Sequence, residues 1–243
     1  MSRLLVIDIE TAPHKVYAWG LWDQRIATNQ IVEPGYTLCF AAKWLGEREI
    51  MFHSVKEGAR RMLRQAHALL DEADAVIHYN GRSFDIPTLR GEFMSSHLRP
   101  AAPFAQIDLI NVARSARMAS RKLDYLAQSI GLGHKIETKG MELWRGCMDG
   151  DAKAWARMER YNKHDVRITE RIYNELRPWI KGHPNLSDGE VACPHCASDK
   201  VQARGYDKTR TMRYQRYQCQ ECGTWFRGAK AVNRHAQVVE IAA

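Results

Sequence analysis

Two acidic side chains interrupt an apolar stretch close to the start of the sequence, which reads RLLVIDIETAP over residues 3–13. On a β-strand alternate side chains share a face, so Asp8 and Glu10 point together and the neighbouring isoleucines point the other way. Two carboxylates on one face of a buried strand repel each other and are costly to desolvate. A bound divalent cation removes both costs. The alternative is a strand end with its acids in water, and the flanking apolar residues argue against it.

Two more acids lie further along the chain. Asp85 follows a short predicted strand in HYNGRSFDIPTL (residues 78–89) and stands at the start of a predicted helix. Asp165 lies inside a predicted helix in ERYNKHDVRITERIY (residues 159–173). Tyr161 precedes Asp165 by four residues, so the two side chains share one face of that helix. Taken singly, each of these acids is more typical of a solvated side chain or a helix cap than of a catalytic group.

The C-terminal part carries two cysteine pairs of the Cys-x2-Cys type. CPHC and CQEC together supply Cys193, Cys196, Cys219 and Cys222. Each pair can hold one side of a tetrahedral zinc ion, and four thiolates leave no open position for catalysis. The spacing therefore predicts one structural Zn²⁺ in a zinc ribbon. Two redox dithiols or disulfides are the alternative, which the absence of secretory features disfavours.

Basic and aromatic side chains are interleaved between the two cysteine pairs. The tyrosines are Tyr206, Tyr214 and Tyr217, and the candidates for substrate binding are Arg204, Lys208, Arg210, Arg213 and Arg216. Cations with interleaved aromatic rings suit the phosphates and stacked bases of nucleic acid. The alternative is a ribbon that contacts the rest of the chain or another protein, so a protein partner stays open for this region.

The pattern of apolar residues predicts the elements that must hold these groups in place. Predicted strands cover residues 3–9, 16–22, 36–46, 48–54 and 75–80, the middle three forming an antiparallel meander. Predicted helices cover residues 56–74, 86–98, 122–132 and 151–180, and a further helix runs from a cap at Asp108 to Ala119. Strands followed by strands that alternate with helices predict an α/β fold, a mixed sheet flanked by helices.

The length, the charge and a change of composition indicate two domains. The 243 residues are enough for one medium domain and one small one. Residues 181–190, KGHPNLSDGE, have little apolar content, which indicates a linker. We therefore predict a domain at residues 1–180, a zinc ribbon at 191–230 and a tail at 231–243. The net charge of +8 favours polyanionic partners such as nucleic acid.

No apolar run is long enough to span a bilayer, and the apolar stretch at the start is short and broken by Asp8. These two features predict no membrane contact, no signal peptide and a cytoplasmic location. Cys39 and Cys147 have no partner at a metal-binding spacing, so we predict free thiols in or near the core.

Taken together, the acids resemble the motifs of the DnaQ-like, or DEDD, family of 3′–5′ exonucleases, which have an RNase H-like fold. DIET is similar to the first motif, NGRSFD to the second and YNKHD to the third, and the resemblance covers roughly residues 3–177. A tyrosine lies four residues before the last acid, and this arrangement resembles that of the Tyr branch of the family. The whole pattern looks closest to the exonuclease domains associated with B-family polymerases. The resemblance implies an RNase H-like mixed sheet, followed here by the small zinc-ribbon domain.

The resemblance also implies a role for each matched residue in a site with two Mg²⁺ or Mn²⁺ ions. Asp8 would bridge both ions. Glu10 and Asp165 would complete one ion site, and Asp85 would support the other. Two such ions, about 3.5–4 Å apart, can hold both the attacking and the leaving oxygen of phosphodiester cleavage. Tyr161 would orient the attacking water.

Asn80 and Phe84 of the second motif would line the substrate groove. The alternatives are a turn residue for Asn80 and a core aromatic for Phe84. The implied function is 3′–5′ exonucleolytic hydrolysis of nucleic acid from single-stranded 3′ ends, with DNA favoured over RNA and the ribbon aiding substrate binding. A non-catalytic nucleic-acid-binding protein and a structure-specific endonuclease on the same fold stay open as alternatives.

Overall fold

The computed structural model describes residues 2–138, 140–187, 189 and 191–232. The chain divides into two compact units, one of residues Arg3–Tyr173 and one made mainly of the residues from Asn174 onward. Each unit has its own sheet. No described helix is both long and apolar enough to cross a membrane.

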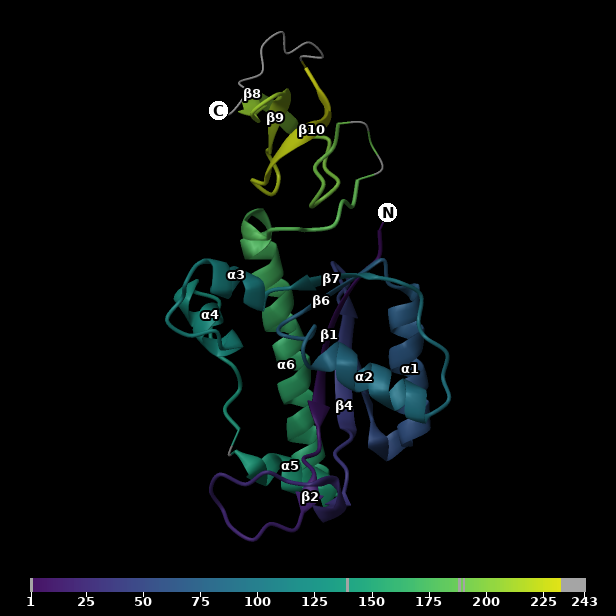
Figure 1. Ribbon diagram of the computed structural model, residues 1–243. Coiled ribbons are helices and arrows are strands. Elements are labelled where there is room, and N and C mark those ends of the chain that lie inside the picture. The colour runs from purple at the N-terminus through teal and green to yellow at the C-terminus, as the bar shows by residue number, and fades with distance from the viewer. Residues whose placement is uncertain (1, 139, 188, 190, 233–243) are drawn as a thin grey trace. The chain divides into compact units, whose positions relative to one another are not determined.

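A mixed sheet of five strands forms the centre of the first unit (Figure 1). Its strands, in spatial order, are β5 (Met51–Ser54), β4 (Thr37–Trp44), β1 (Leu4–Thr11), β6 (Ala75–His78) and β7 (Ala105–Asp108). β4 runs antiparallel to β1 and β5, whereas β6 runs parallel to β1 and β7. The first four residues of β1 are all buried apolar side chains, as expected for a strand that is covered on both faces.

Helices cover both faces of this sheet, and Figure 1 shows α1 and α2 on one side of β1 and α6 on the other. They are α1 (Ala59–Glu72), α2 (Asp85–Ser95), α3 (Ile110–Ser115), α4 (Leu123–Ser129), α5 (Met141–Met148) and α6 (Ala152–Leu176). One buried cluster joins Ile7 of β1 to Met62 of α1 and Phe93 of α2. A second cluster, on the other face, joins Cys39 of β4 to Met158 of α6. The predicted mixed sheet flanked by helices is therefore confirmed.

Most of the predicted elements of this unit form close to the predicted places. The strands predicted at 3–9, 36–46, 48–54 and 75–80 correspond to β1, β4, β5 and β6, and the helices predicted at 56–74, 86–98, 122–132 and 151–180 to α1, α2, α4 and α6. The helix predicted to reach Ala119 is wrong in its length. α3 ends at Ser115, and Arg117 has a φ of 53°, which turns the chain out of the helix. β7 and α5 were not predicted, because elements this short show little periodicity.

The strand predicted at residues 16–22 does not form. Only β2 (Lys15–Val16) pairs, with β3 (Ile31–Glu33), in a small sheet of its own. The apolar residues that follow lie on an exposed loop, where Trp19 and Trp22 are 98% and 83% exposed. A strand needs a neighbour for its backbone N–H and C=O groups, and no described strand pairs with this segment. The antiparallel part of the large sheet is therefore built from β1, β4 and β5.

The second unit contains a three-stranded antiparallel sheet in the order β10–β9–β8. Its strands are β8 (Val201–Lys208), β9 (Arg213–Cys219) and β10 (Trp225–Ala231). Cys219 alone is buried among the residues of these strands, so the sheet has almost no apolar core of its own. The boundaries predicted at residues 180, 190 and 230 stay a proposal. Of the predicted tail at 231–243, the residues from 233 onward lie outside the described part of the chain.

Candidate active site

Three carboxylates from two distant parts of the sequence meet at one face of the large sheet. Asp8 and Glu10 lie on β1, and because side chains alternate along a strand, both point away from the core that α1 and α2 cover. Asp165 comes from α6, the helix on their own side of the sheet. One oxygen from each of the three carboxylates lies within 4.8 Å of the other two. The structure thus brings together three of the predicted site residues, which we call the carboxylate cluster.

The fourth predicted acid, Asp85, lies beside the carboxylate cluster. It is the first residue of α2 and is only 3% exposed. β6 pairs with β1 only over Leu4–Val6. Further along β1, the Ile9 N–H donates instead to Asp85 Oδ1, at 3.0 Å. Asp85 is therefore tied to the backbone next to Asp8, although it is not one of the three carboxylates that meet within 4.8 Å.

Asn162 of α6 orients Asp8, a role that the motif comparison does not assign. Its Nδ2 donates to Asp8 Oδ2 at 2.6 Å and to the Asp8 backbone oxygen at 3.2 Å. Asn162 is fully buried, so this contact is shielded from water.

The pairing of β1 with β4 also shifts register between Glu10 and Thr11. A bulge of this kind changes the direction of the strand next to a site.

Lys135 places a positive charge against the carboxylate cluster. Its Nζ lies 2.5 Å from Asp165 Oδ2 and 5.0 Å from the centre of the Tyr161 ring. His164 of α6 holds the neighbouring segment, because its Nε2 lies 2.9 Å from the backbone oxygen of His134. No role was predicted for Lys135 from the sequence, since it lies outside any helix or strand and matches none of the three motifs.

Tyr161 lies one turn before Asp165 on α6, as the spacing predicted. Its ring packs edge to face on Trp144 of α5, with the ring centres 6.0 Å apart. Trp144 also contributes a hydrogen bond to Glu10. Burial, followed by the negative charge of Asp165, raises the pKa of Tyr161 above its usual range, so its hydroxyl is neutral and can donate. The unpredicted helix α5 therefore supports two of the predicted residues.

Burial and crowding raise the pKa values of all four carboxyl groups. Burial is the main cause for Asp8, and the charge of Asp85 adds to it, so that the pKa of Asp8 lies well above its usual range. Burial outweighs the opposing charge of Lys135 and raises the pKa of Glu10 to about 8. The pKa of Asp85 rises to about 6, again through burial. The pKa of Asp165 is also raised by burial in spite of its ion pair. A single ammonium group thus leaves this site short of positive charge.

The carboxylate cluster fits a divalent cation. Neither oxygen of the buried Asp165 accepts an aligned hydrogen bond, although one of them forms the ion pair with Lys135 at 2.5 Å. Carboxylate oxygens are the ligands that Mg²⁺ and Mn²⁺ prefer. A cation held by Asp8, Glu10 and Asp165 would supply the missing positive charge.

We expect the stability of the protein to depend on pH and on divalent cations together. The acids have raised pKa values in the folded state, so folding favours their protonated forms. That contribution is complete below the unfolded-state pKa values, near 4, and is lost as the pH rises through the folded-state pKa of Glu10, about 8. Without metal, the free energy of unfolding should therefore fall across this interval. Mg²⁺ or Mn²⁺ should restore roughly 2.7 kcal/mol at a concentration a hundredfold above its dissociation constant.

Thermal unfolding near pH 6 and near pH 8, with EDTA or with Mn²⁺, measures this dependence. The shift in Tm caused by Mn²⁺ should be larger at the higher pH, where fewer protons compete for the carboxylates. Asp8→Asn should reduce the shift, whereas Glu47→Gln, on the exposed turn after β4, should leave it unchanged. Equal shifts in the wild-type protein and in the Asp8→Asn variant would contradict the assignment of the cation to these acids.

The loop of the second motif joins β6 to α2 and carries Asn80 and Phe84. Asn80 has a φ of 64° and its N–H donates to Asp108 Oδ1 at 2.7 Å, so it is a turn residue. A Cβ added at Gly81 would lie 2.5 Å from a ring carbon of His78, so the loop requires glycine at that position. Phe84 is 44% exposed, so the alternative of a core aromatic is wrong. Its ring is accessible next to Asp85, which is compatible with the groove position.

The four predicted zinc ligands come together in the second unit. The sulfur atoms of Cys193, Cys196, Cys219 and Cys222 all lie within 4.8 Å of one another. The sulfurs of Cys193 and Cys222 are 3.5 Å apart, and those of Cys196 and Cys219 are 3.6 Å apart. Metal–sulfur bonds of about 2.3 Å place the sulfurs of a tetrahedral zinc site about 3.8 Å apart. The four thiols therefore fit one such ion. Cys39 and Cys147, by contrast, are buried free thiols, as predicted.

Several guanidinium groups of the second unit lie over its aromatic rings. Arg213 lies 4.3 Å from the centre of the Tyr206 ring, and Arg216 lies 5.1 Å from that of Trp225. The other predicted substrate contacts, Arg204, Lys208 and Arg210, are exposed. All five belong to the second unit, whereas the acids belong to the first.

A mixed sheet with acids on its central strand and on a helix across one face defines an RNase H-like α/β protein. The chain belongs to the RNase_H superfamily, whose family model matches residues 5–177. Among solved structures, it is similar to the family B DNA polymerase from the hyperthermophilic archaeon Pyrobaculum calidifontis, with 19% identity and a TM-score of 0.58. That match covers 73% of this chain and 25% of the polymerase chain, so this chain spans about a quarter of the polymerase. At this identity, the likeness supports the fold alone.

A second solved structure with some similarity is RNase D from Trypanosoma brucei, with 16% identity and a TM-score of 0.45. That match covers 74% of this chain and 58% of the RNase D chain. No curated protein sequence matches this chain.

Proposed function

We propose that this protein is a metal-dependent 3′–5′ exonuclease of the DEDD type, with Tyr161 as the tyrosine of the Tyr branch. The observation that carries the proposal is the carboxylate cluster, in which Asp8, Glu10 and Asp165 meet within 4.8 Å. Asp85 beside the cluster and Tyr161 one turn before Asp165 complete the set that the motifs selected. Buried acids with raised pKa values destabilise the fold at neutral pH. A protein that only binds nucleic acid would gain nothing from this loss of stability.

Each of these residues has a task in the proposed mechanism. Asp8, Glu10 and Asp165 would hold Mg²⁺ or Mn²⁺, and Asp85 beside them would support a second ion. Bound cations of this kind lower the pKa of water and neutralise the charge that develops on the phosphate during hydrolysis. Asn162 keeps Asp8 oriented toward the cluster through its 2.6 Å hydrogen bond. The neutral Tyr161 hydroxyl donates a hydrogen bond that positions the attacking water. Phe84, exposed beside the site, offers a surface for the substrate.

A time course on end-labelled single- and double-stranded DNA and RNA, with Mg²⁺, Mn²⁺ or EDTA, tests this function. We expect stepwise shortening of single-stranded DNA from its 3′ end, stopped by EDTA, and no attack on a closed circle. Binding without cleavage would support the non-catalytic alternative, and cleavage of the circle would support the endonuclease. DNA is the favoured substrate because the motifs look closest to polymerase-associated exonuclease domains, so faster shortening of RNA would overturn that preference.

Tyr161→Phe should lower the cleavage rate by about 10²-fold, which is less than the effect of losing a carboxylate. The change removes one hydroxyl but keeps the ring that packs on Trp144. Single-turnover cleavage at saturating substrate measures the effect. His164→Ala is the matched comparison, since it removes only the contact with the His134 backbone and should cost less. A larger loss in His164→Ala than in Tyr161→Phe would contradict the Tyr-branch assignment.

We propose in addition that the four thiols hold one structural Zn²⁺ and that the ribbon binds the substrate. Arg213 and Arg216 lie on aromatic faces, an arrangement that suits phosphates and stacked bases. A protein partner is the alternative for this surface.

A further inference from the structure

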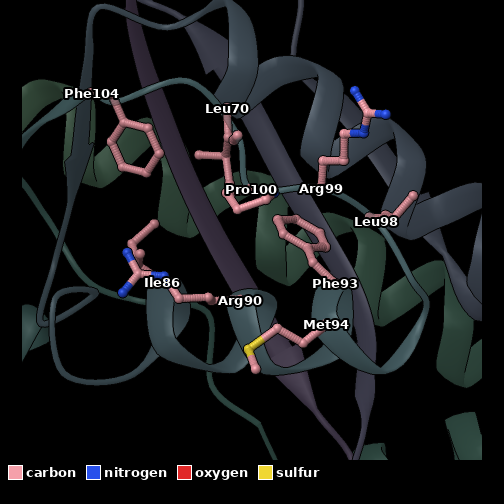
Figure 2. A pocket seen from close by; sticks show the side chains of 10 residues that line it. Leu70, Ile86, Arg90, Phe93, Met94, Leu98, Arg99, Pro100 and Phe104 are labelled. Atoms are coloured by element: carbon pink, nitrogen blue, oxygen red, sulfur yellow. The ribbon is translucent and has the colours of Figure 1, made fainter.

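An apolar cavity lies against the core that α1 and α2 share, away from the carboxylate cluster. Its volume is about 340 Å³, and Leu70 of α1, Phe93 of α2 and Phe104 line it together with the segment 98–101 (Figure 2). Leu70 and Phe93 are buried in that core. Ligand pockets range from about 300 to 1,000 Å³, so this cavity has room for one or two apolar side chains.

The walls of this cavity are fixed by contacts that do not need a ligand. His67 Nε2 lies 2.7 Å from the backbone oxygen of Arg99, and its ring packs on Phe93 with the centres 5.3 Å apart. The Leu98 N–H donates to the Phe93 backbone oxygen at 2.9 Å, and the Ala102 N–H donates to Asp71 Oδ1 at 2.7 Å. The cavity is therefore formed before anything binds to it, which lowers the entropic cost of binding.

Two positive charges flank this apolar surface. Figure 2 shows Arg90 and Arg99 on opposite sides of the apolar side chains. Neither guanidinium makes a hydrogen bond or an ion pair with any residue that the structure describes. Asp71 follows the lining residue Leu70 in the chain, and one of its oxygens already accepts a hydrogen bond from the Ala102 N–H. Unpaired guanidinium groups beside an apolar cavity are complementary to an apolar group that carries a carboxylate.

We propose that this cavity, with Arg90 and Arg99, is a docking site for an acidic peptide segment of a partner protein. The peptide inserts an apolar side chain, and a neighbouring carboxylate pairs with one or both guanidinium groups. A nucleic-acid backbone could pair with the arginines but would leave the apolar cavity unfilled, and a long acyl chain would exceed its volume. Because successive β1 side chains point to opposite faces, a peptide bound here leaves Asp8 and Glu10 accessible. The site recruits a partner without blocking the proposed chemistry.

Fluorescence polarisation with the full-length protein and a Glu-Leu-Phe peptide, labelled at its amino terminus and with a free carboxyl terminus, tests this site. The acid should bind, and the neutral amide Gln-Leu-Phe-NH2 with the same label should bind about tenfold more weakly, because it has no carboxylate to form the charge-assisted hydrogen bond. Arg90→Gln and Arg99→Gln should each weaken binding of the acid by a similar factor but leave binding of the amide nearly unchanged. Ala101→Leu, which fills the cavity, should weaken both peptides. Arg64→Gln, an exposed position of α1 outside the cavity, is the control.

Thermal unfolding of each variant confirms that it is folded before binding is compared. No binding of the free acid at about 1 mM, or equal affinity for acid and amide, would overturn the proposal. Stronger binding of an equally labelled oligonucleotide, lost in Arg90→Gln and Arg99→Gln but kept in Ala101→Leu, would overturn it in favour of a nucleic-acid surface. The peptide test needs no cleavage assay, so its outcome does not depend on the proposed exonuclease function.

Discussion

Asp8→Asn should reduce phosphodiester cleavage by several orders of magnitude while the protein stays folded. The substitution keeps the shape of the side chain and leaves an oxygen that Asn162 can still contact, but it removes a negative charge from the carboxylate cluster. A cation site loses affinity and position when a charged oxygen ligand is removed. Asp165→Asn should have a comparable effect, because it removes the ligand that α6 supplies.

Single-turnover cleavage of a single-stranded DNA oligonucleotide with Mg²⁺, followed with each variant, measures this loss. Glu47→Gln is the control, since it removes an exposed acid outside the site. Tm values in EDTA near pH 8 should be equal to or higher than the wild-type value for Asp8→Asn, because one source of repulsion is gone. Near-normal cleavage in either variant would contradict the assignment of the two acids as metal ligands. A lowered Tm would instead show that the loss of activity comes from unfolding.

Cys219→Ser should unfold the ribbon and leave the first unit folded. Cys219 alone is buried among the residues of β8, β9 and β10, so the sheet has little apolar burial to stabilise it. Structural zinc in small modules contributes on the order of 10–16 kcal/mol to folding. The loss of one of four thiolates therefore removes most of what holds this sheet together. Removal of the metal with a strong chelator should have the same effect.

The zinc content of the purified protein, limited proteolysis and oligonucleotide binding across a salt series test this expectation. Glu221→Gln is the control. Glu221 lies in the same cysteine turn, but its substitution removes only an exposed ion pair with Lys200. Cleavage at saturating substrate should be nearly unchanged, whereas binding should weaken. The slope of log affinity against log salt should fall by about one for each phosphate group that the unfolded ribbon no longer neutralises. Identical affinities and slopes for Cys219→Ser and the wild-type protein would favour a protein partner for the ribbon.

The first motif and the cysteine pairs were readable from the sequence because the rules that position them are local. Strand alternation alone predicted that Asp8 and Glu10 share a face, and helix spacing alone predicted the same for Tyr161 and Asp165. Neither rule identified Lys135. It lies 2.5 Å from Asp165 Oδ2, yet it sits in an irregular segment whose path depends on contacts such as that between His164 and His134.

The strand wrongly predicted at residues 16–22 has the same origin as the missed Lys135, because the structure of both segments depends on distant parts of the chain. Alternating aromatic and apolar residues satisfy the local pattern of a strand, but a strand also needs a hydrogen-bonded neighbour. The large sheet places β4 and β6 on either side of β1, so this segment has no free position beside β1. It becomes a loop with Trp19 and Trp22 exposed. α5 is the opposite case, a helix too short to show a clear period that becomes stable through the contacts of Trp144 and Cys147.

The sequence by itself determined which side chains could take part in metal chemistry and which local elements carry them, because strand and helix periods and the Cys-x2-Cys spacing depend on near neighbours in the chain. Only the tertiary structure decided how the acids are used. It packed α6 against the Asp8 face of β1, tied Asp85 to the Ile9 N–H and brought Asn162 to Asp8. Burial in that packed site, rather than any local pattern, raises the pKa values of the acids and creates the need for a cation.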